Sequence, residues 1–239
     1  MYKPIPPLSF IFYPKITRFF IIAVILCSCI NTETYNGQKV EESKEGLGIT
    51  IKEDSSYYLV EYVDNKMEGL GLMNLSNGNT YVGEWKNDAR NGVGQAYWVD
   101  EDDLGGDSCK GEFSNNLING VAYYSFPDGT YNKGYYKNGR MHGLGMRVWK
   151  NNEWDGDYYI GNWRNGIMYG LGKYFDKSTN VIKEGIFNNH LFIKAKPFTV
   201  QDSLEIMNDI ESELQVVYKR LDSIKPLVEK MSDTLKPLF

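Results

Sequence analysis

Polar and apolar residues alternate in short runs over most of the chain, and clusters of Asn, Asp and Gly separate these runs. In the clearest run, Tyr81, Gly83 and Trp85 occupy every second position, so they share one face of a β-strand. Asn87 and Asp88 follow directly, and both residue types favour tight turns because they tolerate left-handed backbone angles. The pattern therefore predicts a strand with an aromatic face that leads into a hairpin turn.

Two glycines mark the strand that returns from this turn. Gly92 and Gly94 are two residues apart, so we expect them on one face of that strand. Without side chains, they would let aromatic rings of this hairpin and its neighbours lie flat on the backbone. A larger residue at Gly92 is then expected to crowd Trp85. One hairpin alone is marginally stable in water, so each hairpin needs its neighbours.

The same pattern recurs seven times between residue 35 and about residue 190, with successive copies starting 23 to 28 residues apart. The copies start at Tyr35, Tyr58, Tyr81, Cys109, Asn132, Tyr159 and Lys183. The second clearest copy places its repeat residues at Tyr159, Gly161, Trp163, Gly170 and Gly172. All 24 glycines lie between Gly37 and Gly185. A period of this length predicts a stacked array in which each unit buries its apolar face against the next.

The pattern resembles the MORN repeat family, whose unit reads roughly Tyr-x-Gly-x-Trp-x-x-Gly-x-x-x-x-Gly-x-Gly. The resemblance covers about residues 35–190 and implies one β-hairpin per repeat. The expected fold is mainly β: an elongated single antiparallel sheet of stacked hairpins over residues 35–196, followed by an amphipathic helical segment.

That helical segment is expected at 197–239, where glycine disappears. Thr199 and Asp202 resemble a capping box at a helix start. Apolar residues then recur at alternating spacings of four and three, a heptad stripe: Ile210, Leu214, Val217, Leu221, Ile224, Val228, Met231, Leu235 and Leu238. Pro226 lacks a backbone donor, so we expect one helix from about 200 to 224 and a shorter one after it.

Two roles are open for this stripe. It could cover the open end of the sheet, where a strand edge would otherwise be unpaired. Alternatively Leu214, Val217, Leu221, Ile224 and Val228 could pair with a partner helix or with a second copy of the chain. The first role carries slightly more weight, because a repeat array needs a cap.

The N-terminal residues predict secretion and a lipid anchor. Basic residues precede a short apolar run from Phe19 to Leu26, as in a secretory signal rather than a membrane span. Leu26-Cys27-Ser28-Cys29 resembles a bacterial lipobox, which implies removal of residues 1–28, a lipid such as palmitate on Cys29 and a short tether at 29–34. Ile30 follows the cysteine, and by the same resemblance this favours the outer membrane. Periplasmic and surface-facing positions both remain open.

Charge and cysteine content narrow the range of possible functions. The chain has a net charge of −5, and loss of residues 1–28 would change it to −8, since three basic and no acidic residues lie there. Nucleic-acid binding is disfavoured because no basic stripe is visible. Cys109 takes a repeat position that Tyr fills elsewhere, so we expect it to pack as a small apolar residue, with no disulfide.

Catalytic chemistry has little support in the sequence. His142 and His190 each stand alone, so we expect no enzyme and no cofactor. An acidic insert is a weak Ca²⁺ candidate, since carboxylate oxygens suit that ion, but it lacks the EF-hand spacing and a solvated loop is favoured. Its acidic candidates are Asp100, Asp102, Asp103 and Asp107. No metal site is therefore predicted.

The resulting functional hypothesis is a non-enzymatic, membrane-tethered scaffold or adaptor that makes protein contacts in the bacterial cell envelope. A second hypothesis is a binder of envelope glycan or lipid through exposed aromatic residues such as Tyr123, Tyr124 and Tyr135. Rings buried against the glycines would favour the scaffold, and exposed rings along one groove would favour the ligand.

Overall fold

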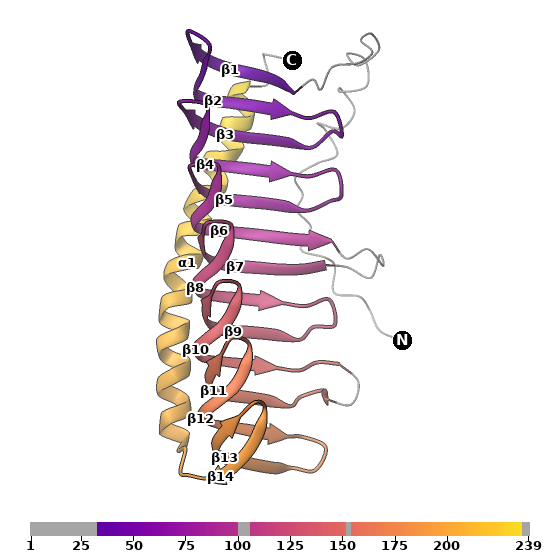
Figure 1. Ribbon diagram of the computed structural model, residues 1–239, viewed down its shortest axis with the longest axis vertical. Helices are drawn as coiled ribbons and strands as arrows, with labels where there is room; N and C mark the ends of the chain where they lie inside the picture. The colour runs from indigo at the N-terminus through magenta and orange to yellow at the C-terminus, as the bar shows by residue number, and fades with distance from the viewer. Residues whose placement is uncertain (1–32, 100–105, 152–153, 236–239) are drawn as a thin grey trace. The chain divides into compact units, whose positions relative to one another are not determined.

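The structure is a computed structural model that describes residues 33–99, 106–151 and 154–235. Its described strands form one open antiparallel sheet in strict chain order, with a single helix, α1, packed on it (Figure 1). The strands are β1 (Thr34–Val40), β2 (Ser43–Ile51), β3 (Tyr57–Val63), β4 (Lys66–Asn74), β5 (Thr80–Lys86), β6 (Ala89–Val99), β7 (Gly106–Ser114), β8 (Leu117–Ser125), β9 (Tyr131–Lys137), β10 (Arg140–Val148), β11 (Tyr158–Arg164), β12 (Ile167–Asp176), β13 (Val181–Asn188) and β14 (Leu191–Ala195). The predicted fold of stacked hairpins with a C-terminal helix is confirmed.

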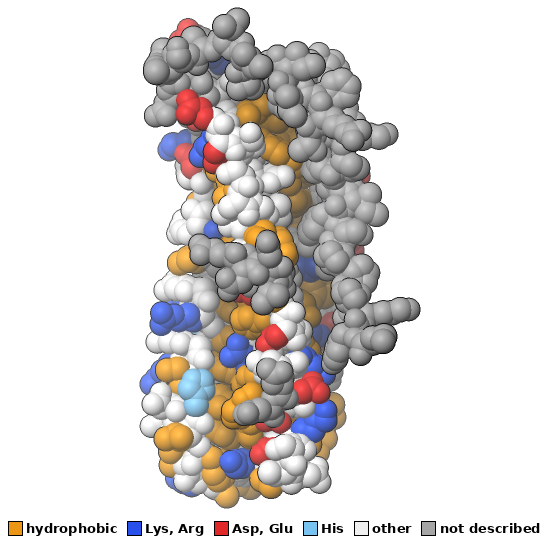
Figure 2. Space-filling view, turned by 90° about the vertical axis from the view of Figure 1, so that its right-hand side faces the viewer, with side chains coloured by type: hydrophobic (Ala, Val, Ile, Leu, Met, Phe, Trp, Pro, Cys, Tyr) orange, Lys and Arg blue, Asp and Glu red, His pale blue; other side chains and the backbone are white. Residues whose placement is uncertain are grey.

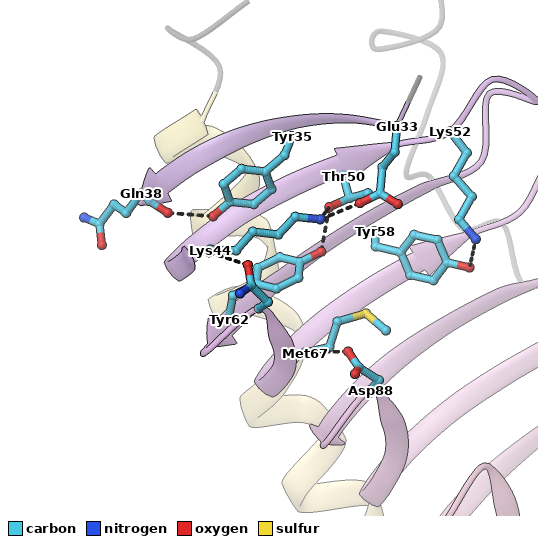
Figure 3. Close-up of polar contacts among 11 residues, drawn as sticks. Glu33, Tyr35, Gln38, Lys44, Thr50, Lys52, Tyr58, Tyr62, Met67 and Asp88 are labelled. Atoms are coloured by element: carbon cyan, nitrogen blue, oxygen red, sulfur yellow. Dashed lines mark hydrogen bonds and ion pairs between the residues drawn. The ribbon is translucent and has the colours of Figure 1, made fainter. Parts of the chain in front are cut away.

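Tight turns close the seven hairpins and bind each hairpin to the one before it. Asn87 and Asp88 have positive φ angles of 48° and 64°, as the sequence predicts for this turn. The Asp88 carboxylate accepts a hydrogen bond of 2.8 Å from the Met67 amide, and the Asp88 amide donates one of 3.1 Å to the Met67 carbonyl (Figure 3). Asn65 makes the same pair of bonds with Lys44. The turn residues thus set the spacing of neighbouring hairpins as well as the bend.

Aromatic rings pack directly on paired glycines, as the sequence predicts. Gly83 and Gly94 lie opposite each other on β5 and β6. The fully buried Tyr81 ring covers both: a Cβ atom built on Gly94 would lie 2.3 Å from the Tyr81 hydroxyl oxygen. That hydroxyl donates a hydrogen bond of 3.0 Å to the Glu84 carbonyl. Any side chain at Gly94 would therefore displace the ring.

The repeat that begins at Tyr159 is packed in the same way. Tyr159 is fully buried, and its hydroxyl donates a 3.0 Å bond to the Asn162 carbonyl. A Cβ atom on Gly172 would lie 2.3 Å from the Tyr159 hydroxyl oxygen, and Gly161 lies opposite Gly172. The packing is therefore a property of the repeat.

The prediction that Gly92 shares a face with Gly94 is wrong. The β5–β6 register shifts between Gly83 and Trp85, so a bulge interrupts the alternation of faces. Gly92 sits in this bulge with φ +93°, and a Cβ atom there would lie 2.2 Å from a Glu84 carboxylate oxygen rather than against Trp85. Gly170 holds the matching place in its copy, with φ +74° and Asn162 as the nearest side chain.

The C-terminal segment forms one helix, α1 (Val200–Leu235), instead of the predicted two. Its start is capped as expected, with the Thr199 amide donating to the Asp202 carboxylate at 2.6 Å. Pro226 lies inside the helix but on its exposed side, where water can hydrate the carbonyl that the proline leaves without a donor. Buried Ile224 and Val228 hold the helix to the sheet on both sides of the proline.

α1 lies along one face of the sheet rather than over its end, which corrects the capping hypothesis. It packs against β2 and β4 to β11 (Figure 1). A helix of 36 residues spans roughly 54 Å at about 1.5 Å per residue, enough to cross nine strand spacings of about 4.8 Å. Every residue of the last strand, β14, remains exposed. No described helix is long and apolar enough to cross a bilayer.

The heptad stripe forms the interface between α1 and the sheet. Its central side chains are at most 4% exposed: Leu214, Val217, Leu221, Ile224 and Val228. They pack within the chain, so the structure does not present them to a partner helix or a second copy. A stripe pattern shows only that an apolar partner exists, and here the partner is the sheet.

Replacing Gly94 with Ala should lower the free energy of unfolding by about 1–3 kcal/mol, because the new methyl group overlaps the Tyr81 ring. Denaturant unfolding followed by circular dichroism measures this change. Gly139→Asn is the matched control: Gly139 has φ +76°, which Asn tolerates, and its Cβ atom would meet nothing within 4 Å. Equal stability of Gly94→Ala and wild type would contradict the packing of ring on glycine.

Replacing Pro226 with Ala should raise the free energy of unfolding by about 1–3 kcal/mol, since it restores a helical hydrogen bond inside a continuous helix. Thermal and denaturant unfolding measure the gain. Val216→Ala, at a position 67% exposed on the same helix, should change stability little. Destabilisation by Pro226→Ala would instead mean that the helix needs the proline to follow the sheet.

Candidate interaction surface

The two faces of the sheet have different roles. On the covered face, apolar residues of α1 such as Ile210 and Leu214 pack against Val121 and Ile160 of the strands. The opposite, open face carries the aromatic residues of the repeats, including Tyr81 and Trp163. No described element packs over the open face, so this face is the candidate interaction surface.

Polar contacts at the rim fix α1 on the covered face. Lys133 pairs with Glu211 at 2.8 Å, and the Tyr135 hydroxyl donates to the Glu213 carboxylate at 2.6 Å. The bond to Glu213, together with burial, raises the pKa of Tyr135 to about 12. The bonds from Lys133 and Gln215 lower the pKa of Glu211. Both shifts favour the protonation states that hold the helix in place at neutral pH.

A third contact joins α1 to a repeat residue that the sequence reasoning did not single out. The Arg220 guanidinium pairs with the Glu84 carboxylate at 2.5 Å. The second oxygen of this carboxylate accepts a 2.7 Å hydrogen bond from the Val93 amide, across the bulge at Gly92. Glu112 and Val121 repeat this bond at 3.0 Å. The sequence signal for this contact was an acidic residue directly after the first repeat glycine, as at Glu84 and Glu112.

The aromatic residues offered for ligand binding do not line one exposed groove. Tyr123 and Tyr135 lie on the covered face beside α1. Tyr124 lies on the open face, where its hydroxyl bonds to Asp107. These three rings therefore do not support direct ligand binding as a group.

Part of the open face is a core of buried rings that solvent does not reach. Trp85, Phe113, Trp163 and Phe187 are each at most 5% exposed and fill it along the sheet. Cys109 is fully buried among them, as predicted for a small apolar residue, and burial raises the pKa of its thiol. This core stabilises the fold but offers no accessible chemistry.

The outer part of the open face carries a row of partly exposed rings and cations that we call the open aromatic strip. It consists of Trp98, Tyr124, Phe126, Arg147, Trp149, Tyr174 and Lys183. Neighbouring rings in it lie close together: 5.9 Å between the Trp98 and Tyr124 centroids and 6.1 Å between those of Trp149 and Tyr174. Figure 2 views the side on which the connections between hairpins lie and shows hydrophobic side chains along its length, with charged groups among them.

Buried or bonded carboxylates position the strip. Asp107 accepts a hydrogen bond from the Tyr124 hydroxyl, and Asp157 accepts one from Tyr174. Burial, with the bond to the carboxylate, raises the pKa of both tyrosines, so they remain neutral donors. The sequence signal for the strip was the position two residues after the Gly-x-Gly pair, which Tyr124 and Tyr174 share.

The remaining predicted site residues are the lipid-attachment cysteine and the acidic residues considered for Ca²⁺. Cys29, Asp100, Asp102 and Asp103 lie outside the described residues, and Asp107 is bonded to Tyr124. The described residues contain no group of three potential metal ligands.

Both histidines make local contacts near turns. The His190 ring accepts a 3.4 Å hydrogen bond from the Met168 amide. The His142 ring lies 3.2 Å from the Asn165 side-chain oxygen.

Comparison with known proteins identifies the repeat. The family model for the MORN repeat matches residues 61–80, 81–102, 109–131, 133–153 and 159–179. These segments run from β3 to the turn that follows β12. A search of curated proteins found no relative that matches the chain.

Replacing Glu84 with Ala should lower the free energy of unfolding by about 1–3 kcal/mol, since it leaves the Val93 amide without its acceptor. Arg220→Ala removes only a partly exposed ion pair and should cost less than about 1 kcal/mol. Glu84→Gln keeps an oxygen for the Val93 amide and should resemble Arg220→Ala. Denaturant unfolding separates the three variants, and equal losses for Glu84→Ala and Arg220→Ala would assign the effect to the ion pair instead.

Proposed function

Because this chain is a MORN-repeat protein, we propose that it is a non-enzymatic, membrane-tethered scaffold or adaptor that holds a protein partner on the open face of its sheet. MORN repeats commonly serve as protein or membrane interaction modules. The choice of a protein partner rests on the residues of the open face.

The observation that carries the proposal is the asymmetry of the two faces. α1 buries one face, whereas the open aromatic strip stays partly exposed along the other. Trp, Tyr and Arg are enriched where proteins meet, because the rings bring large contact areas with few rotatable bonds and the guanidinium brings charged hydrogen-bond donors. Trp98, Trp149 and Arg147 of the strip are of these types.

The tether is the second part of the proposal. A lipid on Cys29 attaches the chain to the envelope membrane, in the outer membrane by the lipobox resemblance. Five residue steps separate Cys29 from Thr34, the first residue of β1. An extended chain spans at most about 3.6 Å per residue, so β1 would lie within about 18 Å of the anchor. A partner on the sheet would then be tethered to the same membrane.

The proposal is tested by placing a photo-crosslinking amino acid at Trp98 or Trp149 of the full-length protein in its native cells. We expect one dominant protein adduct from both strip positions. The same amino acid at Val216, which is 67% exposed on the outer side of α1, should not give this adduct. Cys29→Ser should abolish labelling by a fatty-acid analogue and release the chain from the membrane fraction.

Two results would count against the proposal. Adducts that are the same from Val216 as from the strip would show that the open face is not the contact surface. Retention of the lipid label in Cys29→Ser would show that the anchor lies elsewhere.

A further inference from the structure

Arg147 is one of the two cations of the open aromatic strip and contacts the rings of Phe126 and Trp149. It lies on β10, two residues after Gly145. In the other copies with the Gly-x-Gly pattern or its Ala122 variant, the same position is uncharged: Thr50, Met73, Ala96, Tyr124 and Tyr174. A cation here is thus a feature of one repeat, and packing of the repeat does not require it.

Among the described residues, rings hold the guanidinium of Arg147 and no carboxylate forms an ion pair with it. Its central carbon lies 5.1 Å from the Phe126 ring centroid and 5.6 Å from that of Trp149. Its Nε atom is buried without a hydrogen-bond partner in the described chain. Its terminal nitrogens make no hydrogen bond or ion pair with the described residues, and they are not among the buried atoms. The side chain is therefore positioned with its donors facing outward.

Two other cations on the open face are paired within the chain. Lys44 forms an ion pair with Glu33 (Figure 3). Arg90 donates a 2.8 Å hydrogen bond to the Asn116 carbonyl. Arg147 differs from both because, within the described residues, it has ring contacts and feels the charge of Asp128 but makes no hydrogen bond or ion pair.

Two polar side chains lie beside Arg147. Asn132 is its cross-strand neighbour, is 5% exposed and stands where Tyr81 and Tyr159 bond to the backbone in their copies. The side chains of Asn132 and Tyr136 interact with each other, and this contact lowers the pKa of Tyr136 against the effect of burial. Neither of these two groups therefore needs a ligand. Buried polar groups in native proteins nearly always have partners, so the guanidinium of Arg147 is the group here that a ligand would complete.

Burial also lowers the pKa of the Arg147 guanidinium, which means that its charged form is poorly solvated here. Two carboxylates in this region, Asp128, whose charge acts on Arg147, and Asp157, are bonded to other groups. Asp128 accepts a 2.8 Å bond from the Thr130 amide, and Asp157 accepts bonds from Tyr174 and the Lys177 amide. These acidic groups would repel a densely charged anion, so a single carboxylate fits better.

The ring faces favour a peptide over a sugar. Arg147 lies over the rings of Phe126 and Trp149, and Lys183 lies over that of Tyr174 at 5.9 Å. A sugar needs a free ring face on which to stack, whereas apolar side chains can pack against ring edges. The ligand that fits these residues therefore carries one anionic group for the guanidinium and apolar groups around it.

We propose that Arg147 recognises one Asp or Glu side chain of an otherwise apolar partner segment, which lies along the open aromatic strip. This inference rests on the proposed function and specifies the chemistry of the partner. The carboxylate accepts charge-assisted hydrogen bonds from the terminal nitrogens of Arg147, and the neighbouring rings contact the apolar residues of the segment.

Peptide display on the full-length protein in detergent tests the proposal. Random peptides, fused at their C-termini so that only side chains supply carboxylates, are selected on the wild type and on Arg147→Gln. Wild-type selections should enrich one acidic position flanked by apolar residues, and Arg147→Gln selections should not. Lys183→Gln is the matched control, because it removes an exposed cation from the same strip.

A double-mutant cycle on one selected peptide then measures the contact. Changing its acidic residue to the amide should weaken binding to wild type at least tenfold but leave binding to Arg147→Gln unchanged. Arg147→Lys should restore part of the affinity. Arg147→Met should lose binding while its unfolding midpoint stays at or above that of the wild type, which a purely structural arginine would not show.

The outcomes separate the two proposals. Peptides that bind without an acidic preference, or equally to Arg147→Gln, overturn the role of Arg147. If their binding is still lost in Trp98→Ala, the open face remains the contact surface. Failure to select any peptide that depends on Trp98 would overturn both proposals.

Discussion

The fold depends on the direct contact between an aromatic ring and a pair of glycines on neighbouring strands. A single sheet has no second layer on its open face, so its core must form within the thickness of the sheet and its own side chains. Tyr81 achieves this by lying over Gly83 and Gly94, with no Cβ atom to keep the ring from the backbone. Because one ring covers both strands, this contact stabilises the hairpin, and the same contact recurs in the next hairpin of the array.

The bulge in each hairpin follows from the same constraint. The rings need a glycine pair in register, while the turn needs two residues with positive φ, and the strands accommodate both by shifting register between them. Gly92 occupies the shift, and Glu84 bonds across it to Val93. The same carboxylate meets Arg220 of α1, so the irregularity in the sheet also helps to position the helix.

Covering one face with α1 leaves the protein with a strong asymmetry. The covered face has become an ordinary helix–sheet interface, with every central stripe residue buried. The open face has a closed inner core of rings and an outer strip that remains partly exposed. Chemistry for recognition is therefore concentrated at the strip, where Arg147 lies between Phe126 and Trp149.

The sequence alone determined the hairpins, their turns, the packing of rings on glycines and the capped start of the helix. These features depend on neighbours a few residues apart or on the repeat period, both of which are visible along the chain. Only the tertiary structure decided that Gly92 faces Glu84, that α1 continues through Pro226, and that the stripe covers a face rather than an end. The exposure of the strip and the placement of Arg147 against the Phe126 and Trp149 rings were also decided only in three dimensions. Each of these depends on strand register or on which surface an apolar stripe meets, and such contacts between distant residues leave no periodic trace in the sequence.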